Sequence, residues 1–587
     1  MVDFMLGKPV TFSQGTLYGF YSRQFYQSLY IQDSWKISKR LTANFGVRWE
    51  PYTAVYQSRP FQDLHFDQGL FNAGVHSPHF QYAPAGLVFS GDPQYGCGNS
   101  FNCPKWDKFF PRVGLAWDPQ GNGKMTIRAG YGMLGDRMSM LSLSQEQFGA
   151  PFGNQVSVAG ASLTNPWANY GGGAGGLLPA GQNPLAILAS RSGFGYQAPD
   201  IPFVTAGTYI DSPLNNFHPT YVNQWNLSIQ RQVATNWLLA ANYLGTSTIH
   251  FVSGEQTNPA IFLGLGPCAL QQVNAAGQVI SANQAVCSTT ANQNLRRPLY
   301  LQNPLQGQYY ASVGRVDDGG TQTYDGLNLS AQKRMSGGVN VLANYTWSHC
   351  IGDQWAQNPT NAGVSIPGER RQWRGNCVGP DLRQLFQLSV VATTPKFSST
   401  LVRALASGWQ FAPSMEIKSA QEFSVLAGVD TALSSVPGQP ARLLNTKPYP
   451  SNRTVDHWLD PAAFGGGCTA AQTLAGQTAT CIPLGTYGNL GLNNLKGPGV
   501  FQLDFALSRN FSIREHETLQ IRGEAFNLPN HLNPFTPGQG PTGGTVLGGQ
   551  QNRNAPNFGQ ITSDISGNNG QLNGDYRVIQ LAMKFMF

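Results

Sequence analysis

Three charged residues near the C-terminal end of the chain have the spacing of a single cluster. Arg522 and Glu524 are two residues apart, so they share one face of any strand that contains them. Asp504 lies on the preceding predicted strand, and a turn near Arg514 and Glu515 brings it within cross-strand reach of both. Such a group can contact a protein domain packed against this face. The simpler interpretation is a charge-balanced wall, and both stay open.

A second basic cluster contains Arg370, Arg371 and Arg374 around Trp373. Guanidinium groups bind phosphate in a bidentate fork, so this cluster could contact an anionic ligand or the phosphates of lipopolysaccharide. A solvated loop is the simpler interpretation, and the sequence does not decide between the two.

No catalytic constellation is visible in the sequence. The nine histidines are scattered, and none stands beside a serine or cysteine in a nucleophile motif. His76 and His79 are a weak hint of a metal site, but an exposed loop without metal fits them better. The glycine run at 171–176 has no strand before it and no Lys-Ser/Thr after it, so it is not a phosphate loop. We therefore expect no enzymatic activity, no cofactor and no metal.

The eight cysteines fall two to a predicted loop, and none falls in a predicted strand. Even numbers paired within loops predict four local disulfides, formed in an oxidising compartment such as the periplasm. The expected pairs are Cys97 with Cys103, Cys268 with Cys287, Cys350 with Cys377, and Cys468 with Cys481.

The composition favours a protein whose surface partly faces lipid. Charged residues make up 11% of the chain, against about 25% in ordinary soluble domains. Aromatic residues also make up 11%, and the net charge of +7 is spread too thinly to indicate a nucleic-acid partner. There is no run of about 18 apolar residues. A chain of this kind can cross a membrane only as a β-barrel, because lipid offers no partner to open sheet edges.

Period-two alternation predicts thirteen strands that come mostly as hairpins with short turns. One face of each strand is apolar and the other polar: Phe501, Leu503 and Phe505 oppose Gln502 and Asp504. An apolar outside and a polar lumen are typical of outer-membrane barrels, and a large soluble sheet protein is the less favoured alternative. The predicted strands are 25–37, 40–51, 109–117, 124–134, 221–232, 236–246, 321–334, 338–349, 383–394, 408–418, 500–511, 517–527 and the closing segment 576–587.

Long segments rich in Gly, Pro, Asn and Gln separate the hairpins. In outer-membrane barrels the short turns are periplasmic and the long loops extracellular. The sequence therefore predicts an all-β, antiparallel transmembrane barrel in the bacterial outer membrane. The predicted loops are 52–108, 135–220, 247–320, 350–382, 419–499 and 528–575.

Several stretches resemble, in order, the β-barrel of TonB-dependent receptors, in particular the Oar-like group. They are 29–36 (LYIQDSWK), 41–50 (LTANFGVRWE), 111–117 (PRVGLAW), 345–348 (YTWS), 522–531 (RGEAFNLPNH) and 558–561 (FGQI). The final Phe587 resembles the terminal aromatic that marks such chains for the barrel assembly machinery. The resemblance implies a receptor in contact with outer-membrane lipid and lipopolysaccharide. Its loops would bind a large ligand, and a plug domain and TonB would gate energy-coupled uptake.

The chain also departs from that family. We recognise no signal peptide, TonB-binding box, plug or preceding β-sandwich within residues 1–587. Thirteen strands cannot close with both termini in the periplasm, and a plugged transporter barrel has about 22 strands. We therefore expect a single domain, 1–587, that forms the C-terminal part of a receptor and an incomplete barrel without a plug. A rival count adds one strand within 16–25, which would permit a smaller barrel of fourteen.

Two other functions remain open at this point. The chain could be a structural or adhesive outer-membrane protein whose barrel is only an anchor, or a passive porin without a plug. A plug and TonB box encoded upstream would favour the receptor, and strong surface adhesion without them would favour the anchor.

Overall fold

The computed structural model describes most of the 587 residues. Its description leaves out residues 1–4, 10, 16–21, 59–60, 62, 138–154, 171–179, 184–200, 202, 275, 354–369, 371–373, 378–380, 437, 446, 515–516, 539–551 and 567–575.

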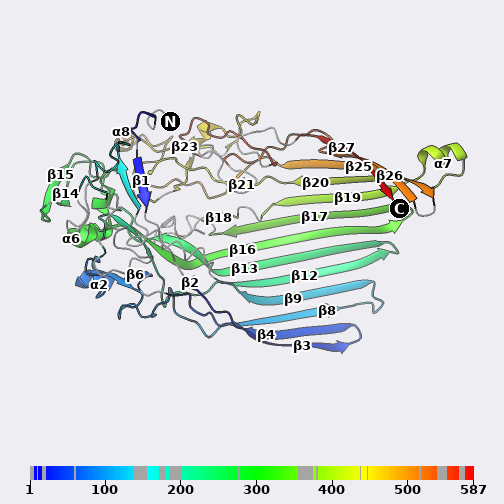
Figure 1. Cartoon of the computed structure of the whole chain (residues 1–587), viewed down its shortest axis with the longest axis horizontal. Helices are drawn as coiled ribbons and strands as arrows, with labels where there is room; N and C mark the ends of the chain where they lie inside the picture. The colour runs from blue at the N-terminus through cyan, green and yellow to red at the C-terminus, as the bar shows by residue number, and fades with distance from the viewer. Residues whose placement is uncertain are drawn as a thin grey trace.

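Thirteen strands form one continuous antiparallel path, in the number and order that the alternation predicts. Strands that are neighbours along this path are also consecutive among these thirteen in sequence, so the sheet is an up-and-down meander. Figure 1 shows short turns at one end of the strands and long connections at the other. The strands are β3 (Leu29–Ser38), β4 (Leu41–Trp49), β8 (Phe109–Trp117), β9 (Met125–Gly135), β12 (Tyr221–Ala234), β13 (Trp237–Gln256), β16 (Tyr310–Ser336), β17 (Val339–Gly352), β19 (Gln384–Thr393), β20 (Trp409–Lys418), β25 (Val500–Arg514), β26 (Glu517–Phe526) and β27 (Val578–Met586).

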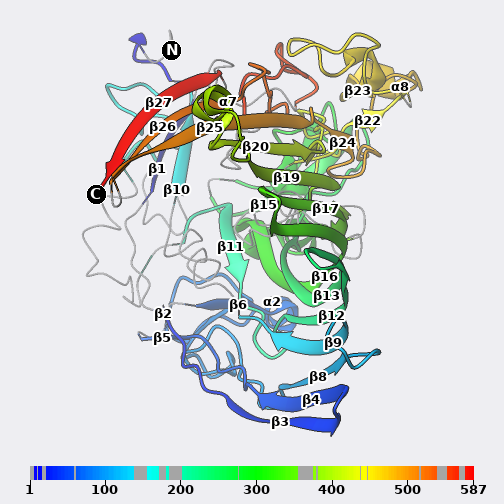
Figure 2. The same ribbon diagram turned by 90° about the vertical axis from the view of Figure 1, so that its right-hand side faces the viewer.

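The sheet curls around an axis along its strands, and its two edges stay apart (Figure 2). β3 and β27 are the edge strands, and no described residue of one pairs with the other. The proposed fourteenth strand does not join this path within the described residues. Ser22–Arg23 form β2, which pairs with β5 (Tyr56–Gln57) in a small separate sheet, and residues 16–21 lie outside the description.

The two faces of the sheet carry the two sets of side chains that the alternation predicts. Directly opposed residues share a face, so the register carries the assignment from strand to strand. Leu227 opposes Tyr243 on one face, and Ser228 opposes Asn242 on the other. Large apolar side chains of the first face stay exposed, including Leu227 at 43% and Leu581 at 83%. An exposed apolar band over many strands is the surface that lipid covers in outer-membrane barrels.

Two strands are longer than the sequence interpretation has them. β13 continues to Gln256, well past 246, and β16 begins at Tyr310, well before 321. The prediction of a loop throughout 247–320 is therefore wrong at both ends. The extensions pair with each other and project beyond the other strands. Loops cover both faces of these extensions, so that even the polar residues Ser253 and Gln256 are buried. Because neither face meets lipid, the extensions lack the apolar-polar alternation that marks a lipid-facing strand.

The hydrophobic core lies in the loops rather than in the sheet. One cluster of buried side chains draws on 64–89, 158–167, 201–209 and 299–313. A second draws on 423–495 together with Phe558. The described parts of the long loops therefore fold into a compact body at one end of the strands, which we call the loop cap.

Short elements build the loop cap, and one helix lies elsewhere. α7 (Thr400–Ala406) connects β19 to β20 at the turn end of the sheet (Figure 1). No helix among the described residues is long and apolar enough to span a membrane. The remaining elements are β1 (Thr11–Gly15), β6 (Leu64–Phe66), α2 (Gln68–Ala73), β7 (Leu87–Phe89), β10 (Gln155–Ala159), β11 (Gly207–Asp211), β14 (Cys268–Val273), β15 (Val279–Gln284), η3 (Gln293–Arg296), α5 (Pro298–Gln302), α6 (Pro304–Gly307), β18 (Gly375–Asn376), β21 (Glu422–Phe423), β22 (Arg442–Leu443), η6 (Pro461–Ala463), β23 (Phe464–Gly465), α8 (Ala470–Leu474) and β24 (Leu495–Lys496).

Candidate functional site: the inner wall and the loop cap

The centre of the inner face is a neutral wall of amides and hydroxyls. Ser228 Oγ donates to Asn242 Oδ1 at 2.6 Å. Asn242 Nδ2 donates to Asn328 Oδ1 at 3.4 Å, and Asn328 Nδ2 donates to Thr346 Oγ1 at 3.0 Å. β12, β13, β16 and β17 contribute one residue each, so a continuous polar ladder crosses four strands. This ladder gives the wall the polar character that the sequence predicts for a lumen.

The inner face of β3, β4, β8 and β9 is basic. Lys36, Arg48, Arg112 and Arg128 lie on it, and these four strands carry no acidic residue on that face. Arg48 forms an ion pair with Glu50 just beyond its strand. Lys36, Arg112 and Arg128 form no ion pair within the described part of the chain. We call these four residues the basic strip.

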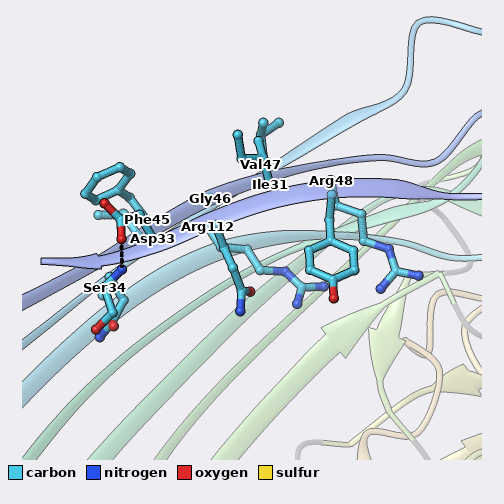
Figure 3. A pocket seen from close by; sticks show the side chains of 13 residues that line it. Ile31, Asp33, Ser34, Phe45, Gly46, Val47, Arg48 and Arg112 are labelled. Carbon is cyan, nitrogen blue, oxygen red and sulfur yellow. Dashed lines mark hydrogen bonds between the residues drawn. The ribbon is translucent and has the colours of Figure 1, made fainter.

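A hollow of about 820 Å³ lies at the β3 edge of the sheet and is lined by residues of β3, β4 and β8, which include Arg48 and Arg112 of the basic strip (Figure 3). Arg48 and Arg112 point to one side of the strands, whereas Ile31 and Val47 point to the other. The size is within the range of ligand pockets, about 300–1,000 Å³. The guanidinium of Arg112, which forms no ion pair within the described residues, suits a carboxylate or phosphate, because arginine binds both in a bidentate fork.

The predicted charged cluster is only partly assembled. Arg522 and Glu524 form an ion pair on the inner face. Asp504 lies on the same face, but its Oδ1 accepts a hydrogen bond from the backbone N–H of Asn527 at 2.9 Å. The amide of Gln502 lies 3.3 Å from both oxygens of Asp504. Asp504 thus accepts a hydrogen bond just after the end of β26, while Arg522 and Glu524 neutralise each other's charge.

A fully buried arginine joins separate segments of the loop cap. Arg296, at the end of η3, is 0% exposed. Its Nη2 donates to the carbonyls of Thr289 and Leu433, each at 2.9 Å, and its Nε donates to Asn292 Oδ1 at 3.0 Å. Its Nη1 donates to the carbonyl of Ile261. One guanidinium thereby ties the loop between β13 and β16 to the loop between β20 and β25.

The next residue reinforces the same junction. Arg297 Nη1 donates to the carbonyl of Asn258 at 2.6 Å, and its Nη2 donates to Ser435 Oγ at 2.9 Å. Burial, together with the charge of Arg296, lowers the pKa of Arg297 to about 10, and Asp430 opposes this shift. The side chain stays charged at neutral pH, so two buried cations hold this junction mainly through backbone carbonyls.

The two described arginines of the second predicted cluster are engaged within the chain. Arg370 Nε donates to Asp317 Oδ2 at 2.6 Å, and its Nη2 pairs with the other oxygen of that carboxylate. Arg374 Nη1 donates to Thr321 Oγ1 at 2.7 Å and lies 3.3 Å from Asp353 Oδ2. The other two members, residues 371 and 373, lie outside the described residues. A role in binding lipopolysaccharide or an anionic ligand stays a prediction.

All four predicted disulfides are present within their own loops. They are Cys97–Cys103, Cys268–Cys287, Cys350–Cys377 and Cys468–Cys481. The expectation that no cysteine lies in a strand is wrong for two of them. Cys268 begins β14, and Cys350 lies in the extended end of β17. β14 lies wholly within the loop cap and β17 continues into it, and there the alternating pattern no longer marks strands.

The terminal residue stands apart from any core. Phe587 follows β27 at the turn end of the sheet and is 95% exposed. It contacts Phe585 in a stacked arrangement with ring centroids 6.1 Å apart. Its role as an assembly signal stays a prediction, and this exposure leaves the side chain free for such a contact.

Sequence reasoning missed two sites in the loop cap. Arg296 has no charged partner nearby in sequence, and its partners are carbonyls, which any residue could supply. His218, His250 and Asp318 also meet, although the hydrogen-bonded pair His218 and Asp318 is separated by 100 residues. The expectation of no metal rests on short spacings, which cannot detect a cluster of residues from three separate segments.

The extended meander, its apolar outer face and its polar inner face define an outer-membrane β-barrel protein. A family model described as "Outer membrane beta barrel domain" matches residues 1–580. The chain belongs to that family and resides in the bacterial outer membrane. No curated protein matches it.

The solved structures that match this chain include one transporter and two receptors. The outer membrane transporter YddB from Escherichia coli has 9% identity and a TM-score of 0.38, with 95% of this chain and 53% of that chain covered. The ferric-catecholate import receptor Fiu from E. coli K12 has 11% identity and a TM-score of 0.35, with 95% and 44% covered. The ferripyoverdine receptor of Pseudomonas aeruginosa has 9% identity and a TM-score of 0.36, with 95% and 38% covered. This chain spans about half or less of each of them.

Proposed function

We propose that the chain is the barrel portion of a TonB-dependent receptor of the Oar-like group. Its loop cap binds a large ligand, and TonB, acting through a plug domain outside residues 1–587, supplies the energy for uptake. The work is binding and conformational gating, without covalent chemistry. The family motifs in the strands and the order of the long loops support this assignment.

The observation that carries the proposal is the ordered loop cap. Two hydrophobic clusters, four disulfides and the buried Arg296 fix the extracellular loops before any ligand arrives. A preorganised surface lowers the entropy lost on binding, which benefits a receptor. A passive pore selects solutes by its width and lining and gains nothing from such a cap. The basic strip favours a ligand or plug segment that carries carboxylates or phosphates.

A comparison of growth media tests the proposal and identifies the ligand at the same time. Three strains of the bacterium that carries the gene are grown in the same medium: wild type, a deletion of this gene and a deletion of tonB. Mass spectrometry of the spent medium then identifies compounds that each strain removes. The proposal expects compounds that wild type depletes and both deletions leave behind.

Other outcomes would contradict the proposal in different ways. Depletion that requires this gene but persists without TonB indicates a passive porin. Identical media from all three strains, combined with lost surface attachment in the gene deletion, indicate the adhesive anchor.

A further inference from the structure

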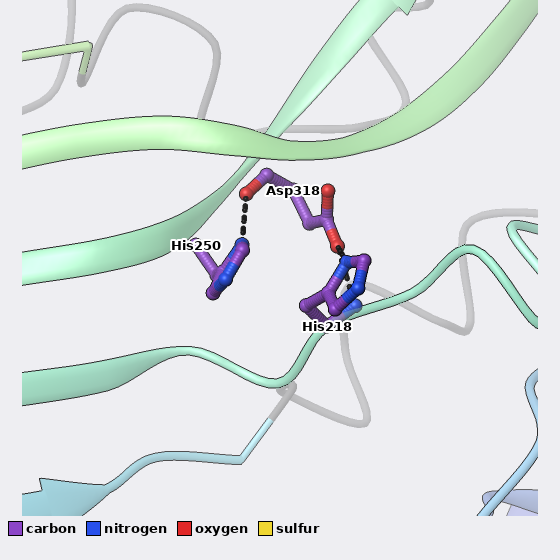
Figure 4. A group of neighbouring side chains, drawn as sticks. All are labelled: His218, His250 and Asp318. Atoms are coloured by element: carbon purple, nitrogen blue, oxygen red, sulfur yellow. Dashed lines mark hydrogen bonds and ion pairs between the residues drawn. The ribbon is translucent and has the colours of Figure 1, made fainter. Parts of the chain in front are cut away.

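Three side chains from separate segments meet where the main strands enter the loop cap. His218 lies three residues before β12, His250 lies in β13 and Asp318 lies in β16. One ligand-capable atom from each residue lies within 4.8 Å of the other two. Figure 4 shows the carboxylate of Asp318 directed at His218 and its backbone carbonyl directed at His250. The group lies among loop-cap segments and shares no residue with the basic strip.

The hydrogen bonds of this group fix the tautomers of both imidazoles. His250 Nδ1 lies 3.2 Å from the backbone oxygen of Asp318, which can only accept, so this nitrogen carries the proton. His218 Nδ1 lies 3.0 Å from Asp318 Oδ2, which likewise accepts when the carboxyl is ionised. In their neutral forms both rings then have a free lone pair on Nε2. An acidic residue that orients metal-binding histidines through Nδ1 is a common arrangement around metal ions.

The backbone around His250 is arranged to direct its side chain. The register between β13 and β16 shifts between Ile249 and Phe251, so His250 is the extra residue of a β-bulge. Its φ of 58° is in the left-handed region, which costs energy for a residue other than glycine. Thr220 Oγ1 donates to the carbonyl of His250 at 2.6 Å and holds it in place. Bulges of this kind re-aim side chains beside functional sites.

We propose that His218 and His250 bind a divalent transition metal ion through Nε2, with Asp318 orienting both rings. Imidazole nitrogens suit Cu²⁺, Zn²⁺ and Ni²⁺ rather than Mg²⁺ or Ca²⁺, and Cu²⁺ binds most tightly of these. One ring nitrogen of His218 lies within 4.8 Å of one ring nitrogen of His250. Metal–nitrogen bonds of about 2.0–2.1 Å place two ligand nitrogens about 3.3 Å apart at a tetrahedral ion. The side chain of His218 is 52% exposed and can turn to close this gap.

The metal joins two parts of the loop cap, because His218 lies on the segment leading into β12 and His250 on the projecting β13–β16 ribbon. This inference goes beyond the proposed receptor function, and metal binding is measured without any uptake. Failure of one therefore leaves the other intact.

Titration of Cu²⁺, Zn²⁺ and Mg²⁺ into the chelator-treated full chain in detergent tests the site. We expect one equivalent of Cu²⁺ to bind, Zn²⁺ to bind more weakly and Mg²⁺ not to bind. The electron paramagnetic resonance spectrum of the Cu²⁺ form should show coupling to imidazole nitrogen. His218→Gln and His250→Asn should each weaken Cu²⁺ binding at least tenfold. Asparagine is chosen at 250 because it tolerates the left-handed backbone.

Two further variants separate a built site from general histidine affinity. Asp318→Ala should weaken binding about tenfold through loss of orientation. His457→Gln, at an exposed histidine elsewhere in the loop cap, should leave binding unchanged. Zn²⁺ should also slow amide hydrogen exchange in residues 247–256 of the wild type. Absence of stoichiometric Cu²⁺ binding, or binding that survives both histidine variants, overturns the proposal.

Discussion

Arg296→Met is the sharpest test of how the loop cap is held together. Methionine replaces the aliphatic stem of Arg296 but makes none of its hydrogen bonds. The carbonyls of Thr289 and Leu433 then lose a charged donor that each now has at 2.9 Å. The Ile261 carbonyl and the Asn292 side chain lose theirs as well.

The expected loss of local stability in Arg296→Met follows from the number of hydrogen-bond acceptors left without a donor. Each buried carbonyl without a partner costs about 1–3 kcal/mol. Removal of the buried charge recovers some desolvation energy, and water reaches some of the carbonyls. The net loss should be about 3–5 kcal/mol of local stability, because four acceptors lose their donor and part of that cost is recovered. A loss of 3 kcal/mol corresponds to about a hundredfold change in an opening equilibrium.

Hydrogen exchange read by mass spectrometry measures this opening segment by segment. Peptides from 257–300 and 425–445 should exchange about a hundredfold faster or more in Arg296→Met. Peptides from β25 and β26 should not change. Arg514→Met is the matched control, because its side chain is 79% exposed and the same charge is removed. Unchanged exchange in both loop segments would refute the role assigned to Arg296.

Three further predictions concern pH, a disulfide and assembly. Burial alone would lower the pKa of His65, but the hydrogen bond and charge of Asp211 outweigh it and raise that pKa. The contact between His65 and Asp211 should therefore stabilise β6 fully below pH ~6.5, and this stabilisation should weaken as the pH rises through the raised pKa of His65. Hydrogen-exchange rates of β6 between pH 5 and 8, corrected for the intrinsic rates, would show this change. Replacing Cys350 and Cys377 by serine opens a ring with a sequence separation of 27, worth about 3.5 kcal/mol of chain entropy, and should speed tryptic cleavage inside it. Deletion of Phe587 should lower the assembled fraction in outer membranes, while the folded protein changes by less than about 0.5 kcal/mol because the side chain is 95% exposed.

Each of these three predictions has a control variant or a result that would contradict it. His65→Gln should abolish the pH dependence, and an equal dependence in that variant would assign it to another group. Serine at Cys97 and Cys103, which close a ring with a separation of only 6, should have the smaller effect. Phe587→Tyr should assemble normally, and normal assembly of the deletion as well would remove the signal role.

The sequence predicts the sheet well because lipid makes the pattern strict. On β12, Leu227 must face lipid and Ser228 the lumen, so alternation marks every strand that crosses the membrane. Beyond the membrane both faces of a strand meet protein, and Ser253 is as buried as its apolar neighbours. Alternation therefore gives no sign of the extended ends of β13 and β16, or of Cys350 within a strand.

The site is less predictable for a related reason. Arg522 and Glu524 are close in sequence, and their ion pair follows from strand geometry alone. Asp504 is on the predicted face, but its partner is a backbone N–H that no sequence motif announces. Arg296 and His250 acquire their surroundings only when distant loops pack together, so spacing along the chain carries no signal for either.

The polar ladder and the basic strip both depend on the division of the strands into a lipid face and a lumen face. Spin labels placed singly at Asn226, Leu227, Ser228 and Ile229 in the membrane-embedded protein test it most directly. Relaxation by oxygen reports lipid exposure, and relaxation by a water-soluble nickel chelate reports the lumen. Labels at 227 and 229 should respond chiefly to oxygen and those at 226 and 228 chiefly to nickel. The same preference at all four positions, or the reverse alternation, would contradict the account.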